Sequence, residues 1–159
     1  MGIMAANSSN QPPESIELLE DYLRALAESH SSREVSQAFS QTVAKLLPTT
    51  SGLLWELSLD RETWRLVCRW QNGTPEMLVP TESADELPQP AEGQFTCELT
   101  AQGLLLGELR ADPQDTLSPS DRSLLNTMAT AAAITMAALV LQRRVRQRNV
   151  RDPLTGIFN

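Results

Sequence analysis

The last third of the chain contains a helix-forming run that is too long to lie within a small domain. It extends from Ser118 to Val150, with Ser118 or Ser120 able to cap its start and no helix breaker before Pro153. About 30 residues at ~1.5 Å each give a rod roughly 45 Å long. Because that length exceeds the width of a small sheet, we expect the end of the helix to project beyond the domain body.

The hydrophobic period of the preceding residues changes from ~3.6 to ~2 along the chain. Apolar residues at helical spacing predict helices over 15–30 and 31–47; Ser31 and Glu34 form a capping pair for the second, and Pro48 ends it. Alternating residues then predict β-hairpins over 52–71 and 95–111, separated by a proline-rich segment with a short edge strand near 76–80. The fold class is therefore α+β: an antiparallel sheet of about five to six strands, two N-terminal helices and a long C-terminal helix packed on one face.

Composition indicates a cytoplasmic protein with an ordinary globular core. The 159 residues are 41% hydrophobic and 21% charged, which is near the average for soluble domains. The formal charge of −7 argues against nucleic-acid binding. Residues 1–13 form a polar lead, expected to be disordered, without a signal sequence. The apolar run 128–141 has only 14 residues, whereas a bilayer span needs about 20, so it predicts a buried helix and no membrane span.

Two neighbouring apolar stripes on the long helix predict two different contacts. Leu125, Met128 and Ala132 are placed to face the domain's own sheet. The second stripe advances by alternating three- and four-residue steps, the spacing of a coiled-coil seam. Its members are Ala131, Ile134, Ala138, Leu141 and Val145. This seam predicts a parallel homodimer through the long helix, together with the first helix.

No group of residues has the spacing of a catalytic, phosphate-binding or metal site. Cys68 and Cys97 occupy inward positions of apolar strands, where cysteine packs as a small hydrophobe, and they can lie near one another across the sheet. The only histidine, His30, falls in a turn between helices and is expected at the surface. The arginines near the end of the long helix complement its dipole.

The outer face of the sheet, away from the helices, is predicted to be charged. Its expected members are Glu56, Arg65, Arg69, Glu98, Glu108 and Arg110. Opposite charges on adjacent strands can pair and tolerate water, so a mostly apolar ligand pocket is not expected there. A small-molecule ligand is therefore a lesser alternative.

The order of these elements resembles a GAF domain, a small-molecule sensor fold, over about residues 14–149, with 118–149 as a long signalling helix. The passage "GLLLGELRADPQDTLSPSDRSLLNTMATAAA" is similar to that family's closing strand, loop, capped helix start and run of small residues. A helix pair ahead of the first strand favours this family over the PAS fold.

The last residues, 150–159, resemble the truncated start of a GGDEF domain. In "DPLTGIFN" the positions that match that family's opening motif are Asp152, Leu154, Thr155, Gly156 and Asn159. The resemblance implies a diguanylate cyclase, which makes cyclic di-GMP from two GTP molecules with Mg, and places its nucleotide and metal residues downstream of the motif. We therefore expect a non-catalytic regulatory sensor and dimerisation domain, with no catalytic residue, cofactor or metal of its own.

Two other functions remain open at this level. One is an interaction-only GAF module that precedes a degenerate GGDEF domain. The other is a redox enzyme on a GAF scaffold, such as a methionine sulfoxide reductase, which would need a reactive cysteine.

Overall fold

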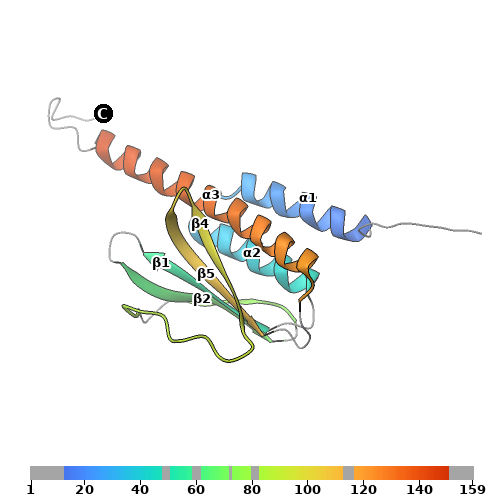
Figure 1. Ribbon diagram of the computed structural model, residues 1–159. Coiled ribbons are helices and arrows are strands. Elements are labelled where there is room, and N and C mark those ends of the chain that lie inside the picture. Colours follow the sequence, from blue (N-terminus) through green and yellow to red (C-terminus); the bar gives the residue numbers. More distant parts are fainter. Residues whose placement is uncertain are drawn as a thin grey trace, which may run out of the picture.

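Three helices lie on one side of an antiparallel sheet in this computed structural model (Figure 1). The structure describes residues 13–47, 51–58, 62–71, 73–79, 83–112 and 117–150. The helices are α1 (Pro13–Ala27), α2 (Ser32–Leu46) and α3 (Pro119–Val150); α2 and α3 pack on the sheet, and α1 packs on these two helices. The strands are β1 (Ser51–Ser58), β2 (Thr63–Gln71), β3 (Glu76–Met77), β4 (Phe95–Ala101) and β5 (Leu104–Asp112). Within the described residues the sheet has five strands in the order β3-β2-β1-β5-β4, which confirms the predicted α+β class.

Side-chain caps fix the starts of α2 and α3. The Ser31 hydroxyl accepts the Glu34 backbone N–H at 3.2 Å, while the Glu34 carboxylate accepts the N–H of His30. For α3 the cap is Ser118, the first of the two candidates, because its Oγ accepts the backbone N–H of Asp121 at 3.1 Å. Both helices therefore begin where the sequence predicts.

The β1–β2 hairpin contains a β-bulge that the sequence pattern does not reveal. Leu54 pairs with Cys68, whereas the next residue, Trp55, pairs with Leu66, so Val67 is an extra residue in β2. One extra residue moves the side chains beyond it to the opposite face of the sheet. The strict alternation expected over 64–70 is therefore wrong for residues 64–66.

Arg65 consequently lies on the helix-covered face, not on the outer face where the pattern placed it. Glu56 lies there for a different reason: it is two residues from buried Leu54 on β1, so the pattern assigned the two faces of β1 the wrong way round. Glu56 and Arg65 are register partners, and Glu56 also pairs with Gly107 on β5. The Ser36 hydroxyl on α2 donates to the Glu56 carboxylate at 2.9 Å, which places this side chain under the helices. Burial raises the pKa of Glu56 because desolvation disfavours the carboxylate; the Ser36 hydrogen bond and two nearby arginines act in the opposite direction.

The β4–β5 hairpin turns at Gln102 and Gly103, within the predicted turn. Their φ angles are +53° and +76°. Two successive positive φ angles are typical of a type I′ turn, whose twist matches that of the flanking strands. A bulge near this turn leaves Leu106 as an extra residue, and its side chain is buried.

The core lies between the sheet and the helices. One row of register partners crosses four strands with all its side chains buried; it consists of Cys68, Leu54, Leu109 and Cys97. The two cysteines are therefore three strand spacings apart, about 14 Å at ~4.8 Å each. The expectation that they lie near one another is wrong. A disulfide needs Cα atoms within about 7 Å, so these thiols cannot pair in this fold.

The first half of α3 is packed against β4 and α2. The stripe predicted to face the sheet is buried, which confirms that prediction; it consists of Leu125, Met128 and Ala132, joined by Ala129, Ala133 and Met136. Tyr22 on α1 is also buried, and its hydroxyl donates to the backbone carbonyl of Met128 at 2.6 Å. This hydrogen bond ties α1 to α3.

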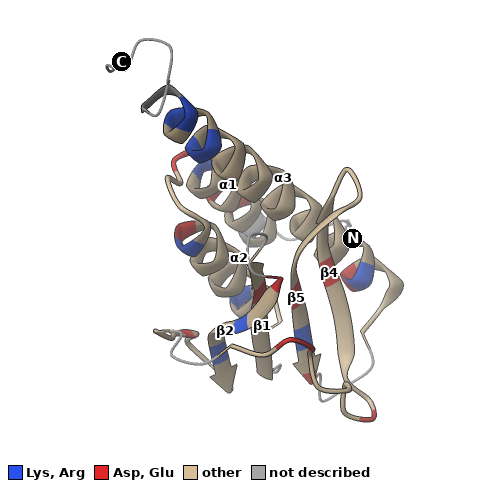
Figure 2. Cartoon of the chain, turned by 90° about the vertical axis from the view of Figure 1, so that its left-hand side faces the viewer, with Lys and Arg blue, Asp and Glu red and all other residues tan. Residues whose placement is uncertain are grey.

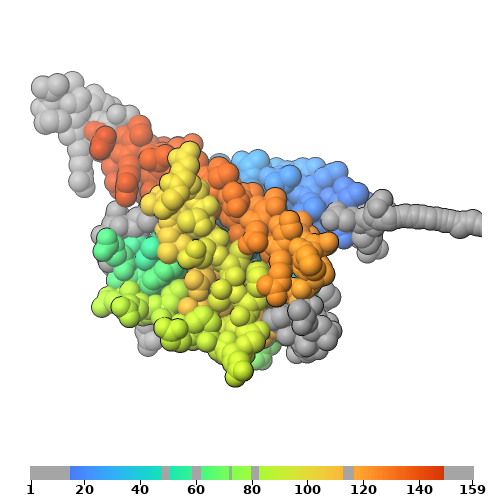
Figure 3. Space-filling view, viewed as in Figure 1, coloured from blue at the N-terminus to red at the C-terminus, as the bar shows by residue number. Residues whose placement is uncertain are grey.

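The second half of α3 extends beyond the sheet, as the red end of the helix shows in Figures 1 and 3. The 32 residues of α3 span about 48 Å at ~1.5 Å per residue, and every side chain from 141 to 148 is exposed. By length and composition alone, the helix Pro119–Arg148 could cross a membrane. Its most apolar stretch has a mean hydropathy of 1.8, and 33% of that stretch is buried inside the fold. A core helix of a globular domain meets the same criterion.

Candidate functional site

The predicted seam of α3 is exposed over most of its length. Ile134, Leu141 and Val145 are 57%, 60% and 56% exposed, and Ala138 is exposed as well. Ala131 differs, because it is half-buried and packs against the core. Residues three and four apart share one side of a helix. The structure therefore places an apolar stripe in solvent, beginning where α3 leaves the core.

Helix α1 presents further apolar side chains to solvent beside α3. Ile16 and Leu23 are 48% and 57% exposed and lie seven residues apart, which puts them on one side of the helix. Among the described residues, five of the seven large exposed apolar side chains belong to α1 and α3. We call these five the apolar helix face: Ile16, Leu23, Ile134, Leu141 and Val145. Large apolar side chains exposed on one element mark candidate interaction surfaces when they form a contiguous stripe, as those of α3 do by their spacing.

The end of α3 is strongly basic, as the blue residues in Figure 2 show. Its exposed arginines are Arg143, Arg144, Arg146 and Arg148. They lie near the negative end of the helix dipole, as expected. The predicted coupling residues Asp152, Leu154, Thr155, Gly156 and Asn159, on which the resemblance to a GGDEF opening motif rests, lie outside the described residues.

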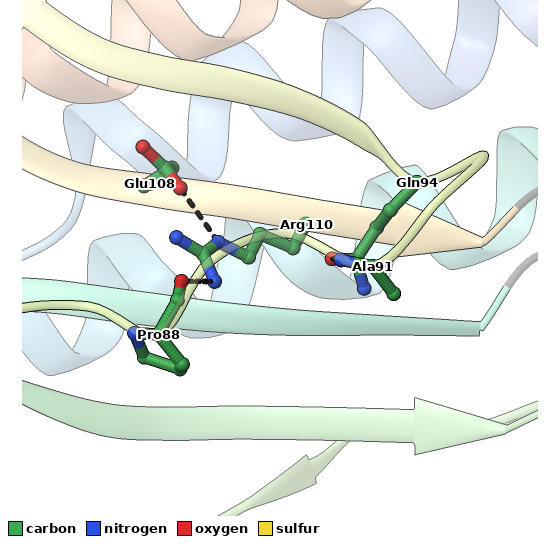
Figure 4. A network of polar contacts seen from close by, with 5 residues as sticks. All are labelled: Pro88, Ala91, Gln94, Glu108 and Arg110. Atoms are coloured by element: carbon green, nitrogen blue, oxygen red, sulfur yellow. Dashed lines mark hydrogen bonds and ion pairs between the residues drawn. The ribbon is translucent and has the colours of Figure 1, made fainter.

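On the outer face of the sheet, a buried arginine holds the segment that crosses it (Figure 4). Arg110 on β5 is only 5% exposed. Its Nε donates to the Glu108 carboxylate at 2.7 Å, and its Nη1 donates to the backbone carbonyl of Pro88. Gln94 accepts the backbone N–H of Ala91 at 3.1 Å and closes the turn in the same segment. The guanidinium thus fixes residues 88–94 over the end of the sheet.

Beside this segment lies a solvent-open hollow of about 580 Å³ on the outer face. Its polar walls include Ser51, Arg69, Gln71, Gln94, Arg110 and Asp112. The volume falls within the ~300–1,000 Å³ of small-molecule sites, but such sites are usually lined by apolar side chains. Leu53 and Trp70 also line the hollow, so it has the size of a ligand site and a lining that mixes polar and apolar side chains. The expected polar character of the outer face is confirmed at Arg69 and Arg110.

Neither cysteine has the surroundings of a nucleophile. Burial raises the pKa of Cys97 to about 11, and burial also raises the pKa of Cys68. The Cys97 sulfur lies 3.2 Å from the side-chain oxygen of Asn126 and so faces α3. Because the thiolate is the reactive form, buried thiols with raised pKa values are inert at neutral pH. Both residues act as core hydrophobes, and this argues against the redox enzyme.

His30 lies at the surface between α1 and α2, as expected. Its backbone N–H, and not its imidazole, takes part in the cap of α2. Within the described ranges no group of three or more His, Cys, Asp or Glu side chains is placed to hold a metal ion.

Several solved structures share this architecture. The GAF domain of an Acinetobacter phosphoenolpyruvate-protein phosphotransferase is 13% identical, with a TM-score of 0.57, and the match covers 82% of this chain and 97% of that one. The GAF domain of the potassium sensor histidine kinase KdpD from Escherichia coli is 14% identical, with a TM-score of 0.59, over 82% and 99% of the two chains. A bacteriophytochrome from R. palustris is 11% identical, with a TM-score of 0.62, over 91% of this chain and 41% of its own.

No family model matches the chain, and no curated protein matches its sequence. At these identities the structural likeness defines the fold. The chain has the GAF domain fold.

Proposed function

We propose that this chain is the regulatory sensor and dimerisation domain of a cytoplasmic diguanylate cyclase and is itself non-catalytic. The observation that carries the proposal is the exposed apolar helix face on a helix that leads directly toward the GGDEF opening motif. The GAF fold supports it, since one structure that shares the fold belongs to a sensor histidine kinase. GTP and Mg would be bound by the GGDEF domain and not by the residues described here.

Dimer geometry would set the rate of such an enzyme. Two GTP molecules, each held by one catalytic domain, must meet in the correct orientation, and orientation contributes strongly to reaction rates. A continuous helix is a stiff connection between a sensor and the domain that follows it. A change in how two copies of α3 pair would therefore change how the two catalytic domains face each other.

The apolar helix face is adequate for a reversible dimer. Covering a large apolar side chain contributes about 1.5–3 kcal/mol when it goes from fully exposed to fully buried, and these side chains are already partly covered. Five such residues from each of two copies then contribute on the order of 10 kcal/mol. Because association costs about 4–15 kcal/mol of lost freedom, the net gain is small, and we expect a weak dimer that forms only at high protein concentration.

Analytical ultracentrifugation tests this proposal. The wild-type chain should be a dimer at high micromolar concentration, and the double substitution Ile134→Asp with Leu141→Asp should make it a monomer, because two charges would be buried in the interface. The matched control is Val79→Asp, which changes an apolar side chain that is 79% exposed and lies outside both helices. A wild-type monomer, or equal dissociation by the control, would contradict the dimer.

The enzymatic half of the proposal is tested on the full-length parent protein. With GTP and Mg, it should form cyclic di-GMP, and the double substitution in α3 should lower the rate. Binding of cyclic di-GMP without turnover would instead support the interaction-only alternative. Inserting a few residues before Arg151 should also alter the rate, because each added residue rotates the following domain by ~100° about the helix axis.

A further inference from the structure

A second cavity lies on the helix-covered side of the sheet, at the point where α3 leaves the body. It has a volume of about 240 Å³ and is enclosed by the β1–β2 hairpin, the start of α2 and the second half of α3. The sheet separates it from the hollow on the outer face. Its polar walls include Ser32, Glu56, Arg65, Arg143, Arg144 and Gln147.

The walls of this cavity favour negative charge. Three arginines, one from β2 and two from α3, line it together with a single carboxylate, that of Glu56. Ser32 is the first residue of α2, so the positive end of that helix dipole also reaches the cavity. Guanidinium groups match phosphate and carboxylate oxygens in pairs, which gives geometric selectivity as well as charge.

The size of the cavity limits what it can hold. Sites for drug-sized ligands occupy about 300–1,000 Å³, and this cavity is smaller. We propose that it binds a small molecule with two or more negative charges on phosphate or carboxylate groups, held by Arg65 and Arg143. This inference concerns a different face from the outer hollow, and it does not depend on the proposed cyclase function.

Glu56 makes this binding sensitive to protons. The groups that act on its carboxylate are Ser36 and Arg33 from α2 and Arg65 from β2. Arg143 and Arg144 of α3 line the same cavity. Burial already raises the pKa of Glu56, and a bound anion would raise it further by like-charge repulsion. At pH values between the pKa of Glu56 in the free and in the bound protein, binding is therefore accompanied by proton uptake, and it weakens as pH rises through that range.

A bound anion would also bridge the sheet and the projecting half of α3. Arg65 belongs to the sheet and Arg143 to the helix, so a ligand held by both restrains the direction in which α3 leaves the domain.

Isothermal titration calorimetry at low ionic strength tests the site. Pyrophosphate and citrate are the two probes, one for phosphates and one for carboxylates, and acetate is the singly charged control. We expect saturable binding of at least one probe and none of acetate. Arg65→Gln or Arg143→Gln should weaken binding by about tenfold or more, because each removes a charge-assisted hydrogen-bond donor.

The matched control is Arg146→Gln, which removes an exposed arginine of the same helix that does not line the cavity. It should leave the affinity within about twofold. Comparing titrations in buffers of different ionisation enthalpy measures the proton uptake, which should disappear in Glu56→Gln. Circular dichroism verifies the fold of each variant. If Arg143→Gln fails to fold, Arg143→Lys replaces it, since it keeps the charge and removes only the paired guanidinium donors.

Two results would overturn the site. One is the absence of saturable binding of both probes at millimolar concentration. The other is an equal loss of affinity in Arg146→Gln, since that would indicate diffuse attraction to the basic end of the helix and not a built cavity.

Discussion

The two halves of α3 are one continuous helix in opposite surroundings. In the first half, residues 119–136, small and sulfur-containing side chains are buried against β4 and α2. In the second half, residues 137–150, the apolar members Leu141 and Val145 are more than half exposed and arginines surround them. We call these the anchored half and the projecting half.

Within α3, the residues that stabilise the fold are therefore different from the residues that are available to bind a partner. An isolated helix of about 14 residues is marginal in water, so the projecting half depends on the hydrogen-bond ladder that continues from the anchored half. The anchored half carries the packing energy. Side chains of the projecting half can therefore serve a partner or a ligand at little cost to the fold.

The largest expected effect comes from placing the same charge in each half. Ala132 is fully buried, whereas Ala138 is exposed. Ala132→Glu should lower the free energy of unfolding by about 4 kcal/mol or more, because a carboxylate would be desolvated without a partner. Ala138→Glu should change it by about 0.5 kcal/mol or less. Urea denaturation at a concentration where the chain is monomeric measures both, and similar losses in the two variants would contradict the comparison.

The second-largest expected effect is a loss of stability at alkaline pH, which arises from a thiol in contact with the anchored half. Cys97 contacts this half, and its pKa is raised from 9.0 to about 11. Between these values the unfolded state loses the thiol proton while the folded state keeps it, so the free energy of unfolding falls as pH rises, by about 2–3 kcal/mol. Below pH ~9 both states hold the proton and this contribution does not vary with pH.

Urea denaturation between pH 8 and 11 measures this loss. Cys97→Ala should reduce the slope in that window without abolishing it, whatever it does to the absolute stability, because burial also raises the pKa of Cys68. An unchanged slope would show that this thiol is not protected in the folded state. The pKa of Tyr22 is also raised by burial, which adds a further loss at higher pH.

The smallest effect concerns the single hydrogen bond between α1 and the anchored half. Tyr22→Phe removes the hydroxyl that donates to the Met128 carbonyl and should cost about 1 kcal/mol. The matched control is Thr127→Ala, which removes an exposed hydroxyl that bonds the Ser123 carbonyl at 3.0 Å on the same helix; it should cost less than about 0.5 kcal/mol. Equal losses of unfolding free energy in the two variants would mean that the hydrogen bond between α1 and α3 does not stabilise the fold more than an exposed one.

The elements of this fold could be predicted because their signals are local. The caps at Ser31 and Ser118, the turn at Gln102 and Gly103 and the buried stripe of α3 all depend on residues within a few positions of one another. The seam could likewise be located from its spacing. The exposure of the seam to solvent could not be predicted, because it depends on how far α3 extends beyond the edge of the sheet.

The candidate cavity was beyond prediction for a related reason. A single extra residue, Val67, reverses the faces of the β2 residues before it and brings Arg65 under the helices, beside its register partner Glu56 on β1. No alternation pattern reveals such a bulge, because the residue that slips is chosen by how two strands pair. The separation of Cys68 and Cys97 was also beyond prediction, because the order of the strands in the sheet places them at opposite ends of one row of paired residues.

The sequence by itself determined which segments are helix or strand, where the helices begin, and that the last helix outgrows its domain. These properties follow from backbone preferences and from burial of one face, both of which are written in neighbouring residues. Tertiary structure decided which charges meet. The Ser36 hydroxyl that donates to Glu56 is 20 residues away in the sequence, and the Pro88 carbonyl that accepts from Arg110 is 22 residues away. Both contacts depend on register and packing that no local pattern encodes.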